Sequence, residues 1–292
     1  MNRPILILLV GIPGSGKTTY ANKYIETNPN TIHLSSDKVR AELWGDEGIQ
    51  GDNNAVFSLM QSRAIEALNN GQSVIYDATN ITRKDRAYII SQCPKFAKVE
   101  AHITWSRIET CIERDAARER TVGKAVIDKM LKRFQAPYYD EGIDEIKVIY
   151  SDVFDHRDYR NKVFLAMNIP HDNPHHKLNI FNHCIAAHIH ADELSDYDED
   201  ISTAALYHDI GKPYVKAFVN TKGEPCEIAH YYQHQCVGAW MSYGFIGITT
   251  PEVAWLISAH MEPFMNSKYY NKLPAYLKAK IDLLHECDLA AH

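Results

Sequence analysis

The stretch "GIPGSGKT" at residues 11–18 constrains the fold of this chain more than any other feature. It fits the pattern G-x-x-x-x-G-K-[ST] and directly follows the apolar run "PILILLV" at residues 4–10, which has the length of a buried strand. Its glycines, Gly11, Gly14 and Gly16, allow backbone N–H groups to turn inward around phosphate oxygens, and the next helix adds partial positive charge at its N-terminus. The pattern therefore predicts a strand, a phosphate-binding loop and a helix in succession.

Two side chains of this loop have the chemistry of nucleotide binding. Lys17 can reach the β- and γ-phosphates, and the Thr18 hydroxyl can ligate Mg²⁺. We expect Ser15 and Thr19, on either side of this pair, to belong to the same site. The predicted cofactors are therefore ATP and Mg²⁺.

The part of the chain that contains this loop alternates short apolar runs with helical patterns. Further strands are predicted at residues 73–77, 99–105 and 146–151. The stretch 54–71 has the apolar period of a helix and ends at Gly71, with one face formed by Val56, Met60, Ala64 and Leu68. Alternating strands and helices predict a parallel sheet covered on both faces.

The character of the chain changes near residue 152. A polar stretch with two prolines leads into segments with helical patterns, and ten of the fifteen histidines lie between His171 and His260. We therefore predict two domains: an α/β P-loop domain over residues 1–152, and an all-α helical domain over residues 153–292.

Composition restricts the setting in which the protein acts. The net charge of -6 argues against a uniformly basic nucleic-acid surface, although a local basic groove remains compatible with it. The six cysteines form no CxxC pair, which is typical of free thiols in a reducing cytosol. The apolar run at residues 4–10 is too short for a membrane span or a secretory signal. We expect a soluble cytoplasmic protein without membrane contact.

Three further residues, two acidic and one arginine, are candidates for the site of phosphate transfer. Asp37 and Arg40 are one helical turn apart, so they can face one spot, where Asp37 accepts a hydroxyl proton and Arg40 holds a neighbouring phosphate. The alternative is a helix start in which Asp37 only complements the helix dipole. Asp77 ends a predicted strand, where a carboxylate can support the Mg²⁺ shell.

The segment "RDAARER" supplies three arginines. Arg114 and Arg118 share a face of the predicted helix, and guanidinium groups on a mobile helix above the phosphates would stabilise the charge that develops in phosphoryl transfer. An ordinary solvated helix face is the alternative, especially for Arg120.

Four stretches together, "GIPGSGKTTYA", "LSSDKVR", "DATNITRKDR" and "CIERDAARERTVGKAVIDKMLKRF", resemble the bacteriophage-type polynucleotide 5'-kinase domain. In that family ATP phosphorylates the 5'-hydroxyl of RNA or DNA. The resemblance implies that Asp37 is the general base and that Lys17 contacts ATP. It further implies substrate contacts for Arg40, Asp77 and Arg83, and lid positions for Arg114 and Arg118. The lid departs from the family pattern Arg-x-x-Lys-Arg-Gly, so the roles of Arg118 and Arg120 stay open.

The second half carries an ordered series of histidines and aspartates around the motif "HDIGKP" at residues 208–213. The members lie in five separate predicted helices or at their ends, with His208 and Asp209 in the same one, so the side chains can converge on one cavity. Imidazole and carboxylate together suit Mn²⁺, Fe²⁺, Co²⁺, Ni²⁺ or Mg²⁺. No cysteine is expected among them, which disfavours a structural zinc site. The members are His183, His208, Asp209, His234, His260 and Asp288.

This series resembles the His-Asp (HD) phosphohydrolase superfamily over residues 170–292. The resemblance implies a first metal on His183, His208, Asp209 and Asp288, and a second on His234 and His260 bridged by Asp209. It also suggests that Lys212 steadies phosphate charge, although a solvated lysine in a turn is an equal alternative. Substrate contacts by His175, His176 and His230 are left open.

Together the two sites indicate an enzyme that heals nucleic-acid ends. A kinase phosphorylates a 5'-hydroxyl, and a metal-dependent phosphohydrolase clears a 3'-phosphate or 2',3'-cyclic phosphate, so that a ligase can act downstream. The partners would then be RNA or DNA ends. The alternatives are a nucleotide-salvage kinase fused to a nucleotidase, or a kinase whose helical domain binds ends without turnover.

Overall fold

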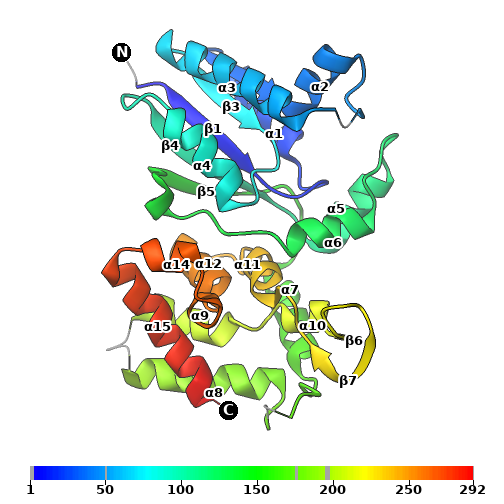
Figure 1. The fold of residues 1–292 in the computed structure, drawn as a ribbon, viewed down its shortest axis with the longest axis vertical. Helices are drawn as coiled ribbons and strands as arrows, with labels where there is room; N and C mark the ends of the chain where they lie inside the picture. Colours follow the sequence, from blue (N-terminus) through cyan, green and yellow to red (C-terminus); the bar gives the residue numbers. More distant parts are fainter. Residues whose placement is uncertain (1–2, 50, 175–176, 195–197, 292) are drawn as a thin grey trace. The chain divides into compact units, whose positions relative to one another are not determined.

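The computed structural model describes residues 3–49, 51–174, 177–194 and 198–291. Contacts divide the chain into two units (Figure 1). The first comprises residues 1–130 and 137–153, and the second comprises residues 131–136 and 154–292.

A five-stranded parallel sheet forms the centre of the first unit, in the order β2-β3-β1-β4-β5. The inner strands β1, β3 and β4 are almost wholly buried, because helices flank the sheet. The strands are β1 (Ile5–Val10), β2 (Thr31–Ser35), β3 (Ser73–Asp77), β4 (Lys98–Trp105) and β5 (Glu145–Tyr150).

Four of the strands begin and end within one residue of the predicted ranges, whereas β2 was not predicted. The sequence of β2, "TIHLS", alternates polar and apolar residues and is partly exposed at its first three positions, as expected for an edge strand. It lacks the continuous apolar run that marks the inner strands.

Helices follow the strands in alternation. The predicted helical face of Val56, Met60, Ala64 and Leu68 is buried in α3, and Ala21 of α1 packs on Ile7, Leu9 and Ile75 of the sheet. The helices are α1 (Lys17–Thr27), α2 (Ser36–Trp44), α3 (Asn53–Asn69), α4 (Arg83–Gln92), α5 (Ile108–Ala116) and α6 (Lys124–Leu131), and a 3₁₀ turn spans Tyr139–Glu141.

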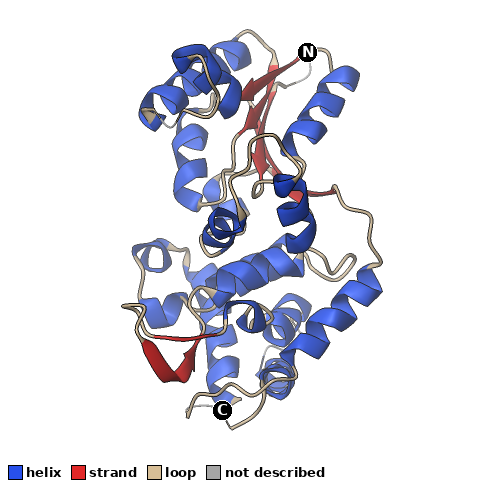
Figure 2. Cartoon of the chain, turned by 90° about the vertical axis from the view of Figure 1, so that its right-hand side faces the viewer, coloured by secondary structure: helices blue, strands red, loops and turns tan. Residues whose placement is uncertain are grey.

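In its described residues the second unit is helical apart from one antiparallel hairpin, β6 (Ala217–Val219) and β7 (Pro225–His230), which the sequence pattern did not predict (Figure 2). Helix α8 packs against α9 and α15, and α12 packs against α9, α11 and α15. The helices are α7 (His156–Met167), α8 (Ile180–Leu194), α9 (Glu199–Tyr207), α10 (Lys212–Val215), α11 (His234–Ser242), α12 (Pro251–Ala259), α13 (Glu262–Met265), α14 (Lys268–Lys272) and α15 (Ala275–Ala290).

Aromatic side chains fill the core of this unit. Trp240 and Trp255 are fully buried, and Phe134 meets the Trp240 ring edge-to-face at 5.3 Å. This contact explains why residues 131–136 belong to the helical unit. The predicted fold class, a parallel α/β sheet followed by a helical region, is confirmed. Among the described residues, no helix is both long enough and apolar enough to cross a bilayer.

Candidate functional sites

The phosphate-binding loop between β1 and α1 depends on two glycines with left-handed backbone. Gly14 has φ 80° and Gly16 has φ 94°, a region that glycine adopts without steric cost. A Cβ at Gly14 would also lie 2.2 Å from the carbonyl oxygen of Cys111. The loop before α1 therefore requires glycine at both positions.

Lys17 folds over this loop. Its Nζ donates hydrogen bonds to the carbonyls of Gly11 (2.9 Å) and Ile12 (3.0 Å). Burial lowers the pKa of Lys17, and the negative charge of Asp77 acts in the opposite direction.

Thr18 meets the end of strand β3. Its Oγ1 donates to Asp77 Oδ2 at 3.1 Å, and His33 Nε2 lies 3.0 Å from the same carboxylate oxygen. A hydroxyl and a carboxylate beside a cradle of N–H groups fit Mg²⁺ and nucleotide phosphates. Sequence reasoning missed His33, because it lies on the unpredicted strand β2.

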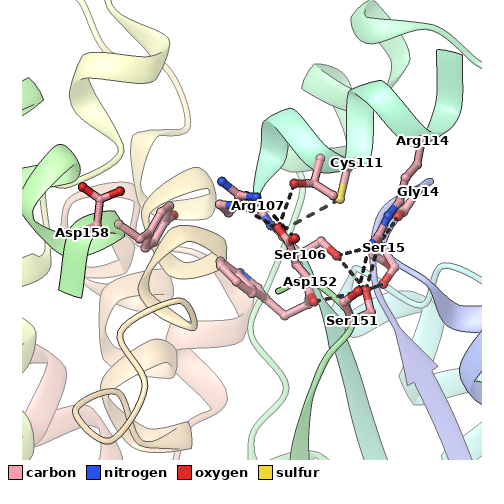
Figure 3. Close-up of polar contacts among 12 residues, drawn as sticks. Gly14, Ser15, Ser106, Arg107, Cys111, Arg114, Ser151, Asp152 and Asp158 are labelled. Atoms are coloured by element: carbon pink, nitrogen blue, oxygen red, sulfur yellow. Dashed lines mark hydrogen bonds and ion pairs between the residues drawn. The ribbon is translucent and has the colours of Figure 1, made fainter. Parts of the chain in front are cut away.

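Arg114 is directed at the loop backbone (Figure 3). Its Nη1 lies 3.0 Å from both Ser106 Oγ and Ser151 Oγ and 3.4 Å from the Gly14 carbonyl, while Nη2 donates to the Ser151 carbonyl at 2.6 Å. Ser151 Oγ in turn donates to the Ser15 carbonyl at 2.6 Å. Arg114 and Ser151 thus hold the loop in shape, and nothing in the sequence marked Ser151 for this position.

The expected helical face shared by Arg114 and Arg118 does not form. Helix α5 ends at Ala116, because the buried Asp115 accepts hydrogen bonds from the N–H groups of Val122 and Gly123 and turns the chain back. Arg118 is consequently exposed in a loop, although its charge still contributes to lowering the pKa of Lys17. Arg120 donates to the carbonyl of Glu47 at 2.8 Å.

The structure pairs Asp37 with Arg40. The two lie at the start of α2 with Arg40 Nη1 2.8 Å from Asp37 Oδ1, and Arg40 also approaches Asn53 Oδ1 at 3.3 Å. Asp37 is 58% exposed and so can meet an incoming hydroxyl, while Arg40 is 13% exposed.

Arg83 and Thr19 occupy different surroundings. Arg83 lies 3.6 Å from Glu141, a carboxylate that the fully buried Arg86 already holds with two hydrogen bonds of 2.7 and 2.8 Å. This network links α4 to the 3₁₀ turn. Arg83 therefore contributes to an ion pair that stabilises the fold. Thr19 is exposed on α1.

The helical unit brings six histidine and aspartate side chains together from five helices or helix ends. They fall into two groups of potential ligands, one of His183, His208 and Asp288 and another of Asp209, His234 and His260, within which the ligand atoms lie no more than 4.8 Å apart. His183 and Asp288 are donated by α8 and α15, His208 and Asp209 follow α9, His234 starts α11, and His260 ends α12.

Short distances link the two groups through Asp209. Its Oδ2 lies 3.3 Å from His208 Nε2 and 3.6 Å from His183 Nε2, and its Oδ1 lies 3.2 Å from His234 Nε2. Asp288 Oδ1 lies 2.8 Å from His183 Nε2.

Backbone carbonyls orient the imidazoles. The Nδ1 atoms of His208, His234 and His260 lie 2.7–2.9 Å from the carbonyls three residues earlier, and His183 Nδ1 lies 3.3 Å from the Ala291 carbonyl. A carbonyl only accepts, so each Nδ1 carries a proton, and each ring presents its Nε2 to the cluster, where a metal ion or a proton can occupy the lone pair.

These lone pairs need a cation between them. His208 and His183 Nε2 are 3.3 Å apart, and His234 and His260 Nε2 are 3.1 Å apart, beside two carboxylates. Burial opposes the charged form of His208, but the charges of Asp209 and Asp288 outweigh it and hold its pKa well above the usual range. Burial and the neighbouring imidazoles lower the pKa of His260 to about 3. Imidazole lone pairs beside buried carboxylates fit a divalent metal.

One expectation about this cluster was wrong. The Cys184 thiol lies with His208 and Asp209 as a third group of potential ligands, contrary to the prediction that no cysteine would be close. Nothing in the sequence marked Cys184 for this place, because consecutive residues on a helix do not face one another. Burial raises the pKa of the thiol, which favours its neutral form.

Lys212 borders the cluster, with Nζ 2.6 Å from Asp209 Oδ2. Burial, together with the charge of Lys212, lowers the pKa of the adjacent His171 to about 4. His230 stacks on Tyr232 at 5.2 Å at the end of the hairpin. The predictions for His175 and His176 lie outside the described residues.

Comparisons with known proteins agree with both halves of this description. Residues 6–137 match the AAA domain family, and residues 180–290 match the HD domain family. The chain thus carries a kinase-like P-loop domain followed by an HD domain, which confirms the predicted pair of domain types. Such a P-loop domain implies ATP and Mg²⁺, and HD domains bind divalent metals. Both assignments support an enzyme.

Individual relatives are distant. The chain is 28% identical over 157 residues to the transcription factor bHLH140 of Arabidopsis thaliana, covering 51% of this chain and 16% of that protein. A chain of the Pnkp1/Rnl/Hen1 RNA repair complex is 23% identical, with TM-score 0.42, covering 46% of this chain and 44% of its own. A fungal RNA kinase is 17% identical, with TM-score 0.38, covering 58% and 89%.

Proposed function

We propose that this protein heals broken nucleic-acid ends by two reactions, one in each unit. The P-loop domain would transfer the γ-phosphate of ATP to a 5'-hydroxyl, and the HD domain would remove a 3'-phosphate or 2',3'-cyclic phosphate. The observation that carries the proposal is the presence, in one chain, of a phosphate-binding loop beside the Asp37–Arg40 pair and of the histidine–aspartate cluster. Together the two reactions convert a 5'-hydroxyl and a blocked 3' end into ends that a ligase can join.

In the kinase reaction, the N–H groups of the loop would position the phosphates while Lys17 neutralises their charge. The exposed carboxylate of Asp37 would accept the proton of the attacking hydroxyl, and Arg40 would hold the adjacent phosphate of the strand. Thr18 and Asp77 would hold Mg²⁺, which neutralises charge on the β- and γ-phosphates. A contact to backbone phosphate does not depend on base identity, so RNA and DNA ends are both candidate substrates.

In the hydrolase reaction, the six histidine and aspartate side chains would hold one or two divalent ions, with Asp209 shared between the two groups. Divalent ions supply a nucleophile from water near neutral pH and polarise the phosphoryl oxygen. Lys212 would face the charge that develops on the phosphate.

The test is an RNA oligonucleotide with a 5'-hydroxyl and a 2',3'-cyclic phosphate, incubated with ATP, Mg²⁺ and Mn²⁺ and read at both ends by mass spectrometry. We expect the native protein to change both ends, Lys17→Ala to lose only 5' phosphorylation, and Asp209→Asn to lose only 3' processing. Lys23→Ala on the exposed face of α1 and Asp158→Asn on α7 are matched controls that should keep both activities.

Three other results would refute parts of the proposal. A 5' end that gains phosphate beside a 3' end unchanged in any divalent metal would assign another substrate to the HD domain. Reaction of mononucleotides without reaction of the oligonucleotide would indicate salvage. Metal-independent RNA binding without phosphate release would make the HD domain a binding module.

A further inference from the structure

The Lys212 side chain stands at the border of the histidine–aspartate cluster and is only 8% exposed. Its Nζ lies 2.6 Å from Asp209 Oδ2, 3.3 Å from His171 Nε2, and 5.4 Å from the centre of the Tyr231 ring. An ammonium has three N–H donors and no acceptor. Among the described residues the ammonium makes one hydrogen bond, to His171, and one ion pair, to Asp209, which leaves an N–H for an oxygen atom of a ligand.

The bonding of His171 defines its tautomer. His171 Nδ1 lies 2.9 Å from the Leu178 carbonyl, which only accepts, so Nδ1 carries the ring proton. The ammonium of Lys212 only donates, so His171 Nε2 accepts from it. His171 is itself 2% exposed, so it acts through Lys212 and not by touching a substrate.

The backbone around His171 is anchored to the hairpin. The Tyr231 hydroxyl donates to the His171 carbonyl, and the Ala229 N–H donates to the Asp172 carbonyl at 2.9 Å. Lys216 Nζ adds a 2.7 Å bond to Asp172 Oδ2. Asp172 has φ 48°, a left-handed conformation that Asp tolerates better than most residues, and these bonds fix it there. His171 is therefore held before any substrate arrives.

We propose that His171 is a positioning residue that shares the Lys212 ammonium with Asp209 and aims its third N–H at the phosphate group in the HD site. This inference rests on the proposed phosphohydrolase function. With Asp209 as its only strong partner, the ammonium would turn fully toward a carboxylate that is needed to bind metal. His171, as a second acceptor, keeps the Lys212 ammonium from turning fully toward Asp209. Because the ammonium is largely shielded from water, its attraction for a phosphate oxygen is stronger.

The test combines four variants: His171→Leu removes the acceptor, His171→Gln retains one, Lys212→Met removes the charge, and the fourth joins His171→Leu with Lys212→Met. His190→Leu, on the exposed face of α8, is the control histidine. Three quantities are measured on the full chain: kcat and KM for a 3'-phosphorylated oligonucleotide with Mn²⁺, the Kd of inorganic phosphate for the Mn²⁺-loaded protein, and the Kd of Mn²⁺ itself.

We expect Lys212→Met to lower kcat roughly 10²- to 10³-fold, as loss of one oxyanion donor does. His171→Leu should lower it roughly 10- to 100-fold, and His171→Gln should regain most of the loss. The double variant should be no worse than Lys212→Met alone, because both changes remove the same interaction. Phosphate binding should weaken in His171→Leu and Lys212→Met alike, and Mn²⁺ binding should stay near the native value.

Additive losses in the double variant, weakened Mn²⁺ binding in His171→Leu, or no recovery in His171→Gln would overturn the positioning role. If the native protein releases no phosphate, the hydrolase proposal fails. Non-additive weakening of inorganic phosphate binding would still support the role of His171, and unchanged phosphate binding would refute it.

Discussion

Gly211 offers a test of how the histidine–aspartate cluster is assembled. It follows His208 and Asp209 and lies directly against the first turn of α11, where a Cβ would come 2.1 Å from the His234 carbonyl oxygen and 2.6 Å from Gly238 N. Its φ of -79° suits any residue, so alanine causes no backbone strain of its own. The effect of Gly211→Ala therefore comes from the forced separation alone.

The size of that separation follows from the contact distance. A Cβ essentially never approaches another heavy atom within 3.0 Å, so the two segments must move apart by about 1 Å. The same two segments carry Asp209 and His234, whose ligand atoms are 3.2 Å apart. Metal–ligand distances tolerate only about 0.2 Å, so we expect metal affinity to fall roughly 10- to 100-fold. Overpacking should also lower the free energy of unfolding of the helical unit by about 1–3 kcal/mol.

The assay is a calorimetric titration with Mn²⁺, with nucleotide binding by the P-loop domain as the internal reference. Gly238→Ala is the matched control: it changes the same interface from the opposite side, but its Cβ would find its nearest neighbour at 3.3 Å. Equal Mn²⁺ affinities for Gly211→Ala and the native protein would refute the reasoning, since the cluster would then tolerate a displacement that its geometry does not allow.

Two further predictions concern the sheet domain. Replacing the fully buried Arg86 by Met leaves the Glu141 carboxylate without its two-bond partner, so the free energy of unfolding of the sheet unit should fall by about 3–5 kcal/mol. Hydrogen exchange of β4 amides at increasing urea should show this loss, and much of it should be recovered when Glu141→Gln is added. Burial acts to raise the pKa of Glu100, but hydrogen bonds from Lys147, two other side chains and nearby charge outweigh it and lower the pKa to about 2 from 4.5. Since the folded pKa is the lower one, this stabilisation, about 3 kcal/mol, is present above pH 4.5 and is lost as the pH falls toward 2. Hydrogen exchange of β4 amides should show the loss in the native protein; a Glu100→Gln variant with the same pH profile would contradict it.

Local sequence patterns were sufficient for much of the fold. Continuous apolar runs predicted the four strands other than β2, and the glycine spacing predicted the loop before α1. Both signals depend on neighbours in the chain, because burial of a strand on both faces or a left-handed turn is specified by a few adjacent residues. Strand β2 and the β6–β7 hairpin escaped prediction, because partly exposed strands carry polar residues and lack such runs.

The residue types of the candidate sites were likewise readable in the sequence, whereas their arrangement was not. Three findings depend on contacts between residues distant in the chain. Cys184 lies among the potential ligands, Arg114 holds the phosphate-binding loop through Ser151, and His171 shares the Lys212 ammonium. Such contacts depend on which helices pack together and where each one ends. The sequence by itself determined which chemistry the chain carries, and the tertiary structure decided which atoms face one another.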